Sequence, residues 1–272
     1  MNLKKLKMKK FTGLLLAFVA VTMFISCSDD DSPASDQNAR VKISMTDAPG
    51  DYEAVFVHVT DVKIKADAAA DEEGWVSLSN VKPGIYDLLT LTGGVTQLLA
   101  DAEVPAGFLG QIRLILGNDN TVVINGESQA LSTPSAQQSG LKLKVDQELE
   151  AGVEYEYLLD FDVDKSIVSA GNSGGFNLKP VIRLSMMEGT GTISGEVQPS
   201  LFQSVVTATN ASHNNISAYT AADGKFSLNG VPAGTYQVTV TPALLSGLEV
   251  KVINNVQVAA GASVALEAIF LE

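Results

Sequence analysis

The stretch QIRLILGNDNTVVING, residues 111–126, decides the fold class of the first half of the chain. Its first six residues place apolar side chains at every second position, the period of a strand with one buried face. The polar run at 118–120 then predicts a turn, residues 121–124 predict a second strand, and Asn125-Gly126 predicts a tight hairpin turn. The stretch therefore indicates antiparallel β-structure.

The surrounding sequence continues this pattern in both directions. Further strands are predicted at residues 41–45, 55–59, 62–65, 141–145 and 155–163. Only residues 95–102 have a helical pattern, and that segment is short. Strands at roughly ten-residue spacing, with turn residues between them, indicate a β-sandwich or barrel-like domain over residues 40–188.

The composition changes near residue 189, where we expect a second domain over 189–272. Residues 40–189 hold 11 basic and 22 acidic residues, whereas 190–272 hold only 2 and 5. Turn signals at Asp223-Gly224 and Asn229-Gly230 flank one predicted strand. The seven strands predicted for this domain span 192–197, 204–209, 216–220, 225–228, 235–241, 250–258 and 264–270. The predicted fold class is therefore all-β, with two tandem β-sandwich domains.

The N-terminus has the pattern of a secretion signal. Residues 1–10 hold five lysines, and residues 11–25 form an apolar run. That run is shorter than the roughly 20 residues that a membrane-spanning helix needs. Ser26 and Cys27, the sole Cys of the chain, follow this run, and residues 24–27 resemble a bacterial lipobox. We therefore expect a lipoprotein signal peptide over 1–26 and lipidation of Cys27.

An acidic segment, residues 27–39, follows the signal and predicts a flexible tether, because small, polar and acidic residues bury too little apolar area to fold. The Asp-rich run after Cys27 resembles the surface-export signal of Bacteroidota lipoproteins. The resemblance implies an outer-membrane lipoprotein exposed on the cell surface. A periplasm-facing lipoprotein is the alternative.

Charge and composition exclude several functional classes. The whole chain has a net charge of −13, and removal of the five lysines in the signal leaves 13 basic against 31 acidic residues, or −18. Such a chain repels phosphates, so we expect no nucleic-acid partner. One Cys and two His exclude a disulfide framework, a zinc cluster and an iron–sulfur site.

The C-terminal 80 residues or so resemble a carboxypeptidase-regulatory-like domain, which is a transthyretin-like β-sandwich. The stretches that carry this resemblance are residues 193–197, 221–228 and 231–238. An Asp-Gly turn before Phe226 and the Pro-x-Gly-x-Tyr pattern ending at Tyr236 are its most specific features. The resemblance implies an accessory module without peptidase activity, with a carbohydrate-binding-like fold.

The first domain resembles the domain of unknown function DUF4382, found in secreted and lipid-anchored bacterial proteins. The stretches that carry this resemblance are residues 45–49, 86–89, 106–113, 159–162, 165–168 and 178–183. The family brings no established catalytic residues to this chain.

Three aspartates at two-residue spacing form the candidate metal site. Asp160, Asp162 and Asp164 share one face if they lie in one strand. Crowded carboxylates repel one another unless a cation separates them, and Ca²⁺ takes six to eight oxygen ligands. The hypothesis is a Ca²⁺ site completed by Asp47 or Asn118. The alternative is a strand end whose carboxylates are solvated or paired with nearby lysine and arginine residues.

Trp75 is the candidate ligand contact, because an exposed indole can stack on a sugar ring. The alternative is packing in the core or at a strand edge. His58 and His213 have no nucleophile near them in the sequence, so no catalytic triad is indicated.

The sequence thus predicts a non-catalytic binding or adhesion module that needs no cofactor apart from the hypothetical Ca²⁺. A glycan is the expected ligand class, on the strength of fold-level resemblance. Its partners would be the membrane, through lipidated Cys27, and a glycan or an envelope protein. The alternatives are a structural subunit of a fimbria-like or envelope assembly and, third, an enzyme with an unidentified site.

Overall fold

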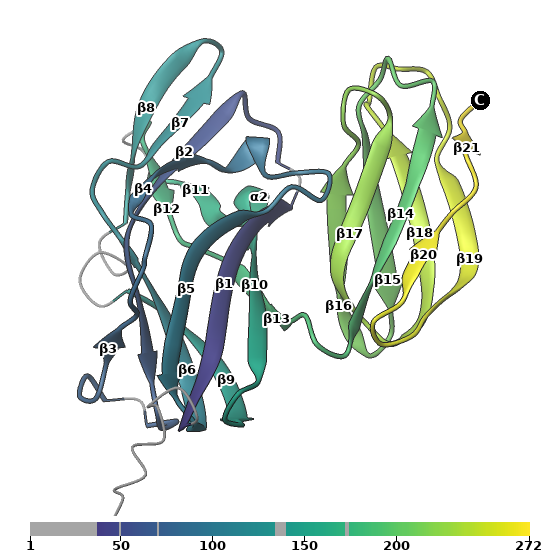
Figure 1. Ribbon diagram of the computed structural model, residues 1–272. Coiled ribbons are helices and arrows are strands. Elements are labelled where there is room, and N and C mark those ends of the chain that lie inside the picture. Colours follow the sequence, from purple (N-terminus) through teal and green to yellow (C-terminus); the bar gives the residue numbers. More distant parts are fainter. Residues whose placement is uncertain (1–36, 49, 70, 134–139, 172–173) are drawn as a thin grey trace, which may run out of the picture. The chain divides into compact units, whose positions relative to one another are not determined.

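The computed structural model describes residues 37–48, 50–69, 71–133, 140–171 and 174–272. These residues belong to one compact unit, Ala34–Glu272. The structure is nearly all β, and its strands build two sandwiches (Figure 1). The predicted all-β fold is confirmed. The predicted signal peptide, Cys27 and most of the predicted tether lie outside the described residues. Within the described residues, no helix has the length and apolar character that a membrane crossing requires.

The first sandwich packs a four-stranded sheet against a larger one. The smaller sheet has the order β13 (Ile182–Met186), β10 (Glu154–Asp162), β1 (Asn38–Ala48) and β5 (Gln97–Pro105). The larger sheet runs β11 (Ile167–Ser169), β12 (Phe176–Leu178), β8 (Glu127–Ser132), β7 (Thr121–Ile124), β2 (Ala54–Lys65), β6 (Gly107–Leu116) and β9 (Leu141–Leu149). Two short strands, β3 (Val76–Ser77) and β4 (Gly84–Asp87), also pair with β2. Two short helical turns, η2 (Leu88–Thr90) and α2 (Val163–Ser166), follow β4 and β10.

The second sandwich has two four-stranded sheets. One has the order β17 (Lys225–Pro232), β14 (Thr190–Gln198) and β20 (Ser263–Ala265), with β21 (Ile269–Phe270) also paired to β14. The other has the order β16 (His213–Tyr219), β15 (Ser204–Asn210), β18 (Gly234–Pro242) and β19 (Lys251–Val258).

Each sandwich has its own hydrophobic core, built from the alternate residues of facing strands. In β1, for example, Val41, Ile43 and Met45 are completely buried. Side chains at every second position of a strand point to one face, so the period-two patterns of the sequence become the two inner faces. No residue is shared between the two buried clusters.

The predicted hairpin at Asn125-Gly126 joins β7 to β8. Both residues have positive φ, 53° and 75°, as a type I′ turn requires. The β1 strand begins at Asn38, two residues inside the predicted tether, because Asn38 and Ala39 pair with the end of β5.

Two local predictions were wrong. The segment predicted to be helical is largely strand β5, because pairing with β1 outweighs the helix propensity of its Leu and Ala residues. Asn229-Gly230 does not end a strand. It lies inside β17, where Gly230 has a φ of 62° and the pairing with β14 shifts register. A Gly with positive φ inside a strand marks a bulge as readily as a turn.

Candidate functional site

A row of cations crosses the solvent-side face of the larger sheet in the first sandwich. β2, β6 and β9 lie side by side, and their register pairs Lys63 with Arg113 and Arg113 with Lys142. The next row pairs Lys65 with Gln111 and Gln111 with Lys144. The residues between them in the sequence belong to the core, so the paired residues face away from it. We call this surface the cationic face; its residues are Lys63, Lys65, Gln111, Arg113, Lys142 and Lys144.

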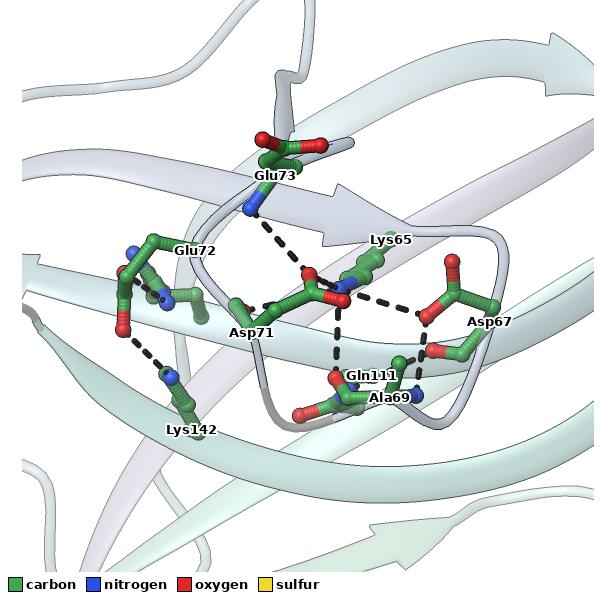
Figure 2. A network of polar contacts seen from close by, with 9 residues as sticks. Lys65, Asp67, Ala69, Asp71, Glu72, Glu73, Gln111 and Lys142 are labelled. Carbon is green, nitrogen blue, oxygen red and sulfur yellow. Dashed lines mark hydrogen bonds and ion pairs between the residues drawn. The ribbon is translucent and has the colours of Figure 1, made fainter.

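Three carboxylates from the segment after β2 lie over this face. Asp67, Asp71 and Glu72, which we call the acidic arm, point toward the cations in Figure 2. Lys65 is 1% exposed, and its Nζ forms ion pairs with Asp71 and with Asp67, the latter at 3.3 Å. The same Nζ donates a hydrogen bond to the carbonyl oxygen of Ala69 at 3.1 Å. Lys65 is therefore a buried cation with its counter-charges in place.

Glu72 bridges two strands of the sheet. Its carboxylate accepts from Arg113 Nη2 at 2.8 Å and from Lys142 Nζ at 2.6 Å. These hydrogen bonds, the one from Lys142 first, hold the pKa of Glu72 below its usual value. The hydrogen bond with Lys65 likewise lowers the pKa of Asp71, and both acids therefore carry their charge at neutral pH.

A glycine lets the acidic arm lie flat on the sheet. A Cβ added to Gly110 of β6 would lie far inside van der Waals contact distance of the Asp67 carbonyl oxygen. Gln111, next in the strand, donates from Nε2 to the carbonyl oxygen of Ala69 at 2.8 Å. Both the backbone and the carboxylates of the acidic arm are therefore held against the sheet.

Trp75 lies beside the same cations. The Arg113 guanidinium carbon is 3.9 Å from the centre of the indole ring, and Lys65 Nζ is 6.0 Å from it. Both distances are in the range of cation–π attraction. The indole N–H and the Arg113 Nε are both buried and have no hydrogen-bond partner among the described residues. The predicted ligand residue therefore belongs to a cluster of cations.

The structure brings three of the four predicted calcium ligands, Asp160, Asp162 and Asp164, to one cleft, but not on one strand face. β10 ends at Asp162, so Asp164 lies in α2 and not on the strand face predicted for it. Asp160 accepts two hydrogen bonds from Arg183, at 2.8 and 3.1 Å, and Asp162 accepts the backbone N–H of Lys165. These contacts are the ones that the alternative interpretation expected.

Asp47 does not join the other three. Asp160, Asp162 and Asp164 line one cleft of about 640 Å³, which Asp47 does not line. In the parallel pairing of β1 with β10, Asp47 lies opposite Phe161 and Asp160 lies opposite Thr46, so the two carboxylates leave the sheet on opposite faces. Across the described residues, no three Asp, Glu, His or Cys side chains are grouped so that they could hold a metal ion.

The candidate site also contains Lys65, Arg113 and Lys142, which the sequence did not single out. The signal was present: Lys63 and Lys65, and Lys142 and Lys144, are pairs of basic residues at strand period in an acidic chain. Only the order of the strands in the sheet shows that the pairs belong to one surface.

A family model described as a domain of unknown function, DUF4382, matches residues 38–180, more than half of the 272-residue chain. The chain belongs to the DUF4382 family. The resemblance of the first domain to DUF4382 is therefore confirmed. The DUF4382 match contains the cationic face, the acidic arm and Trp75, so the whole candidate site lies within the family's domain.

Among solved structures, this DUF4382 protein is similar to the Bacillus anthracis TIE protein, at 12% identity and a TM-score of 0.23, over 86% of this chain and 34% of that one. The DUF4382 chain thus spans about a third of the length of that structure. A variant of the shaft pilin SpaA from Lactobacillus rhamnosus GG is similar at 10% identity and a TM-score of 0.21, over 86% and 97% of the two chains. The fimbrial anchor protein Mfa2 from Porphyromonas gingivalis is similar at 9% identity and a TM-score of 0.16, over 74% of this chain and 78% of that one. These scores are too low to carry a functional argument. No curated protein matches the chain.

Proposed function

We propose that this DUF4382 protein is a non-catalytic binding module of the bacterial cell envelope, held at the outer membrane by a lipid on Cys27, with carbohydrate as its ligand class. The observation that carries the proposal is Trp75 beside Arg113 and Lys65 on the solvent side of the sheet. An indole offers a flat apolar surface to a sugar ring, and neighbouring cationic donors suit its hydroxyl groups. The C-terminal sandwich would be the accessory, carboxypeptidase-regulatory-like module of the same protein.

Replacement of Trp75 tests this proposal. Screening on a glycan array should identify a bound sugar, and Trp75→Ala should weaken its binding about tenfold or more, as loss of an aromatic anchor does. Isothermal titration measures the affinity. Trp75 is the sole Trp of the chain, so a change in tryptophan emission on titration reports this site alone.

Phe108→Ala is the matched control, because Phe108 is an exposed aromatic residue elsewhere on β6. It should leave the affinity unchanged. If the wild-type protein binds no glycan, or if Trp75→Ala binds as tightly as the wild type, the carbohydrate proposal is wrong.

A structural role in an envelope assembly is the second candidate, and the open side of the second sandwich favours it. β19 is the last strand of its sheet, so its outer edge has no strand partner among the described residues. A groove of about 650 Å³ lies along it, lined mainly by apolar residues such as Ile253 and Leu266. Val252 and Phe270 are 44% and 63% exposed beside that groove. Exposed apolar residues beside a groove of this kind commonly mark association surfaces.

The occupant proposed for this edge is a second copy of the chain. In an antiparallel pair of β19 strands, Lys251, the one charged residue of the strand, lies at opposite ends of the two copies, so like charges stay apart. We expect the purified protein to dimerise with rising concentration in sedimentation velocity, and Val252→Glu/Phe270→Glu to remain monomeric. Leu201→Glu, which also replaces an exposed apolar residue in this part of the chain, should dimerise normally. A wild-type protein that stays monomeric at high concentration contradicts this role.

A further inference from the structure

We infer that the cationic face is a binding site for an anionic polysaccharide, and that Asp71 and Glu72 occupy the positions of the ligand's carboxylates. The inference rests on the proposed carbohydrate binding at Trp75 and names the class of sugar. The acidic arm would then be a built-in competitor, which the polysaccharide displaces.

The cations of the site are built into the sheet, whereas their partners are not. Lys65 is 1% exposed and Arg113 is 6% exposed, each on a separate strand. Buried cations need counter-charges, and here the acidic arm supplies them rather than the neighbouring strands. The side chains of Asp71 and Glu72 are themselves 59% and 62% exposed. The carboxylates therefore lie between the cations and solvent, on the side from which a ligand would arrive.

The spacing of the cations suits a linear polyanion. Neighbouring strands lie about 4.8 Å apart, so an extended chain crossing β2, β6 and β9 passes a cation on two or three of them. The carboxylate of Glu72 already forms ion pairs with both Arg113 and Lys142.

The acidity of the rest of the chain does not prevent this binding. At physiological ionic strength, electrostatic interactions are screened over about 8 Å, so the charge of the face itself dominates at contact. Carboxylates at these cations favour a uronic-acid polymer over a nucleic acid, because a carboxylate is the group that the site holds in the structure.

The test compares polygalacturonate with its fully methyl-esterified form, which has the same sugar without the charge. Asp71→Asn/Glu72→Gln should bind polygalacturonate about 3- to 10-fold more tightly than the wild type, because it removes the competing carboxylates. Gly110→Ala should act in the same direction, since its Cβ displaces the backbone of Asp67 while every charge remains. These gains cannot come from misfolding.

Arg113→Gln/Lys142→Gln should lose about tenfold or more in affinity for polygalacturonate, and should lose much less for the methyl-esterified form, which has no carboxylates for these cations to bind. The matched control for Asp71→Asn/Glu72→Gln is Glu103→Gln/Asp119→Asn, which removes two carboxylates that lie away from the cationic face. This control should bind polygalacturonate as the wild type does. Isothermal titration at two salt concentrations measures all of these affinities, and added salt should weaken only the binding of the charged polymer.

Equal affinities of the wild type and Asp71→Asn/Glu72→Gln for polygalacturonate would overturn the inference, as would equally tight binding of single-stranded DNA. If the wild-type protein binds the methyl-esterified polymer but has no preference for the charged one, this inference fails and the proposed carbohydrate binding stands. If it binds neither polymer nor any other glycan, both fail.

Discussion

Asp47→Asn is expected to stabilise the folded protein at pH 7, by about 2–4 kcal/mol in the free energy of unfolding, and to change it little at pH 4. Asp47 is 2% exposed, and among the described residues neither of its carboxyl oxygens has a partner at hydrogen-bonding geometry. A buried carboxylate without partners is costly, whereas the neutral amide of Asn avoids that cost at nearly the same volume.

The physical reason is a displaced pKa. Burial first, and then repulsion from Asp160, raise the pKa of Asp47 from 3.8 to about 9, and an interaction with the backbone N–H of Val163 offsets only part of this. Between pH 4 and pH 9 the folded state therefore binds a proton that the unfolded state has lost. In this window the contribution of Asp47 to stability falls as the pH rises, and below pH 4 the group costs nothing.

Denaturant titrations of the wild type and Asp47→Asn at several values between pH 4 and pH 8 measure this effect. Subtracting the two free energies of unfolding cancels the contributions of the groups that both proteins share. The difference should grow steadily with pH. Glu127→Gln, at an exposed side chain of β8, is the control and should stay within about 0.5 kcal/mol of the wild type throughout. A difference between Asp47→Asn and the wild type that does not change with pH would refute the explanation.

The fold was predictable because its strands carry their own periodicity. The alternation of residues 111–116 and the Asn125-Gly126 turn are local signals, and the structure uses both as expected. The segment that became β5 shows the limit of such reasoning. Its Leu, Ala and Glu residues favour a helix, and only the neighbouring β1 strand, more than fifty residues away in the sequence, makes it a strand.

The candidate site was less predictable, because it depends on which strands are neighbours. Lys65, Arg113 and Lys142 are far apart in the sequence, and each occupies a polar position of an alternating strand, with no local sign that Lys65 and Arg113 are buried. The aspartates show the same dependence. The spacing of Asp160, Asp162 and Asp164 predicted one strand face, but β10 ends at Asp162, and Asp47 leaves the neighbouring strand on the face opposite to Asp160. Sequence periodicity gives the face of a strand, whereas register and strand order give the partners.

Arg183→Leu is expected to destabilise the protein by about 3–5 kcal/mol, the cost of leaving a buried charge without its partner. Arg183 Nη2 and Nε donate to Asp160 Oδ2 at 2.8 and 3.1 Å, and Asp160 is 7% exposed. Burial raises the pKa of Asp160, and Arg183 is the main group that opposes this. Without the guanidinium, the carboxylate must either take up a proton or remain charged in the interior.

The double variant Asp160→Asn/Arg183→Leu separates the charge from the packing. It removes both members of the pair, so it should recover most of the stability that Arg183→Leu loses, and a double-mutant cycle from denaturant titrations gives the coupling energy. Lys165→Met is the control, because Lys165 forms an ion pair with Asp162 while its own side chain is 71% exposed, and its loss should cost no more than about 1 kcal/mol. If the double variant is as unstable as Arg183→Leu, then Arg183 stabilises the sheet through its packing and its other hydrogen bonds, and the buried charge of Asp160 is not the cause.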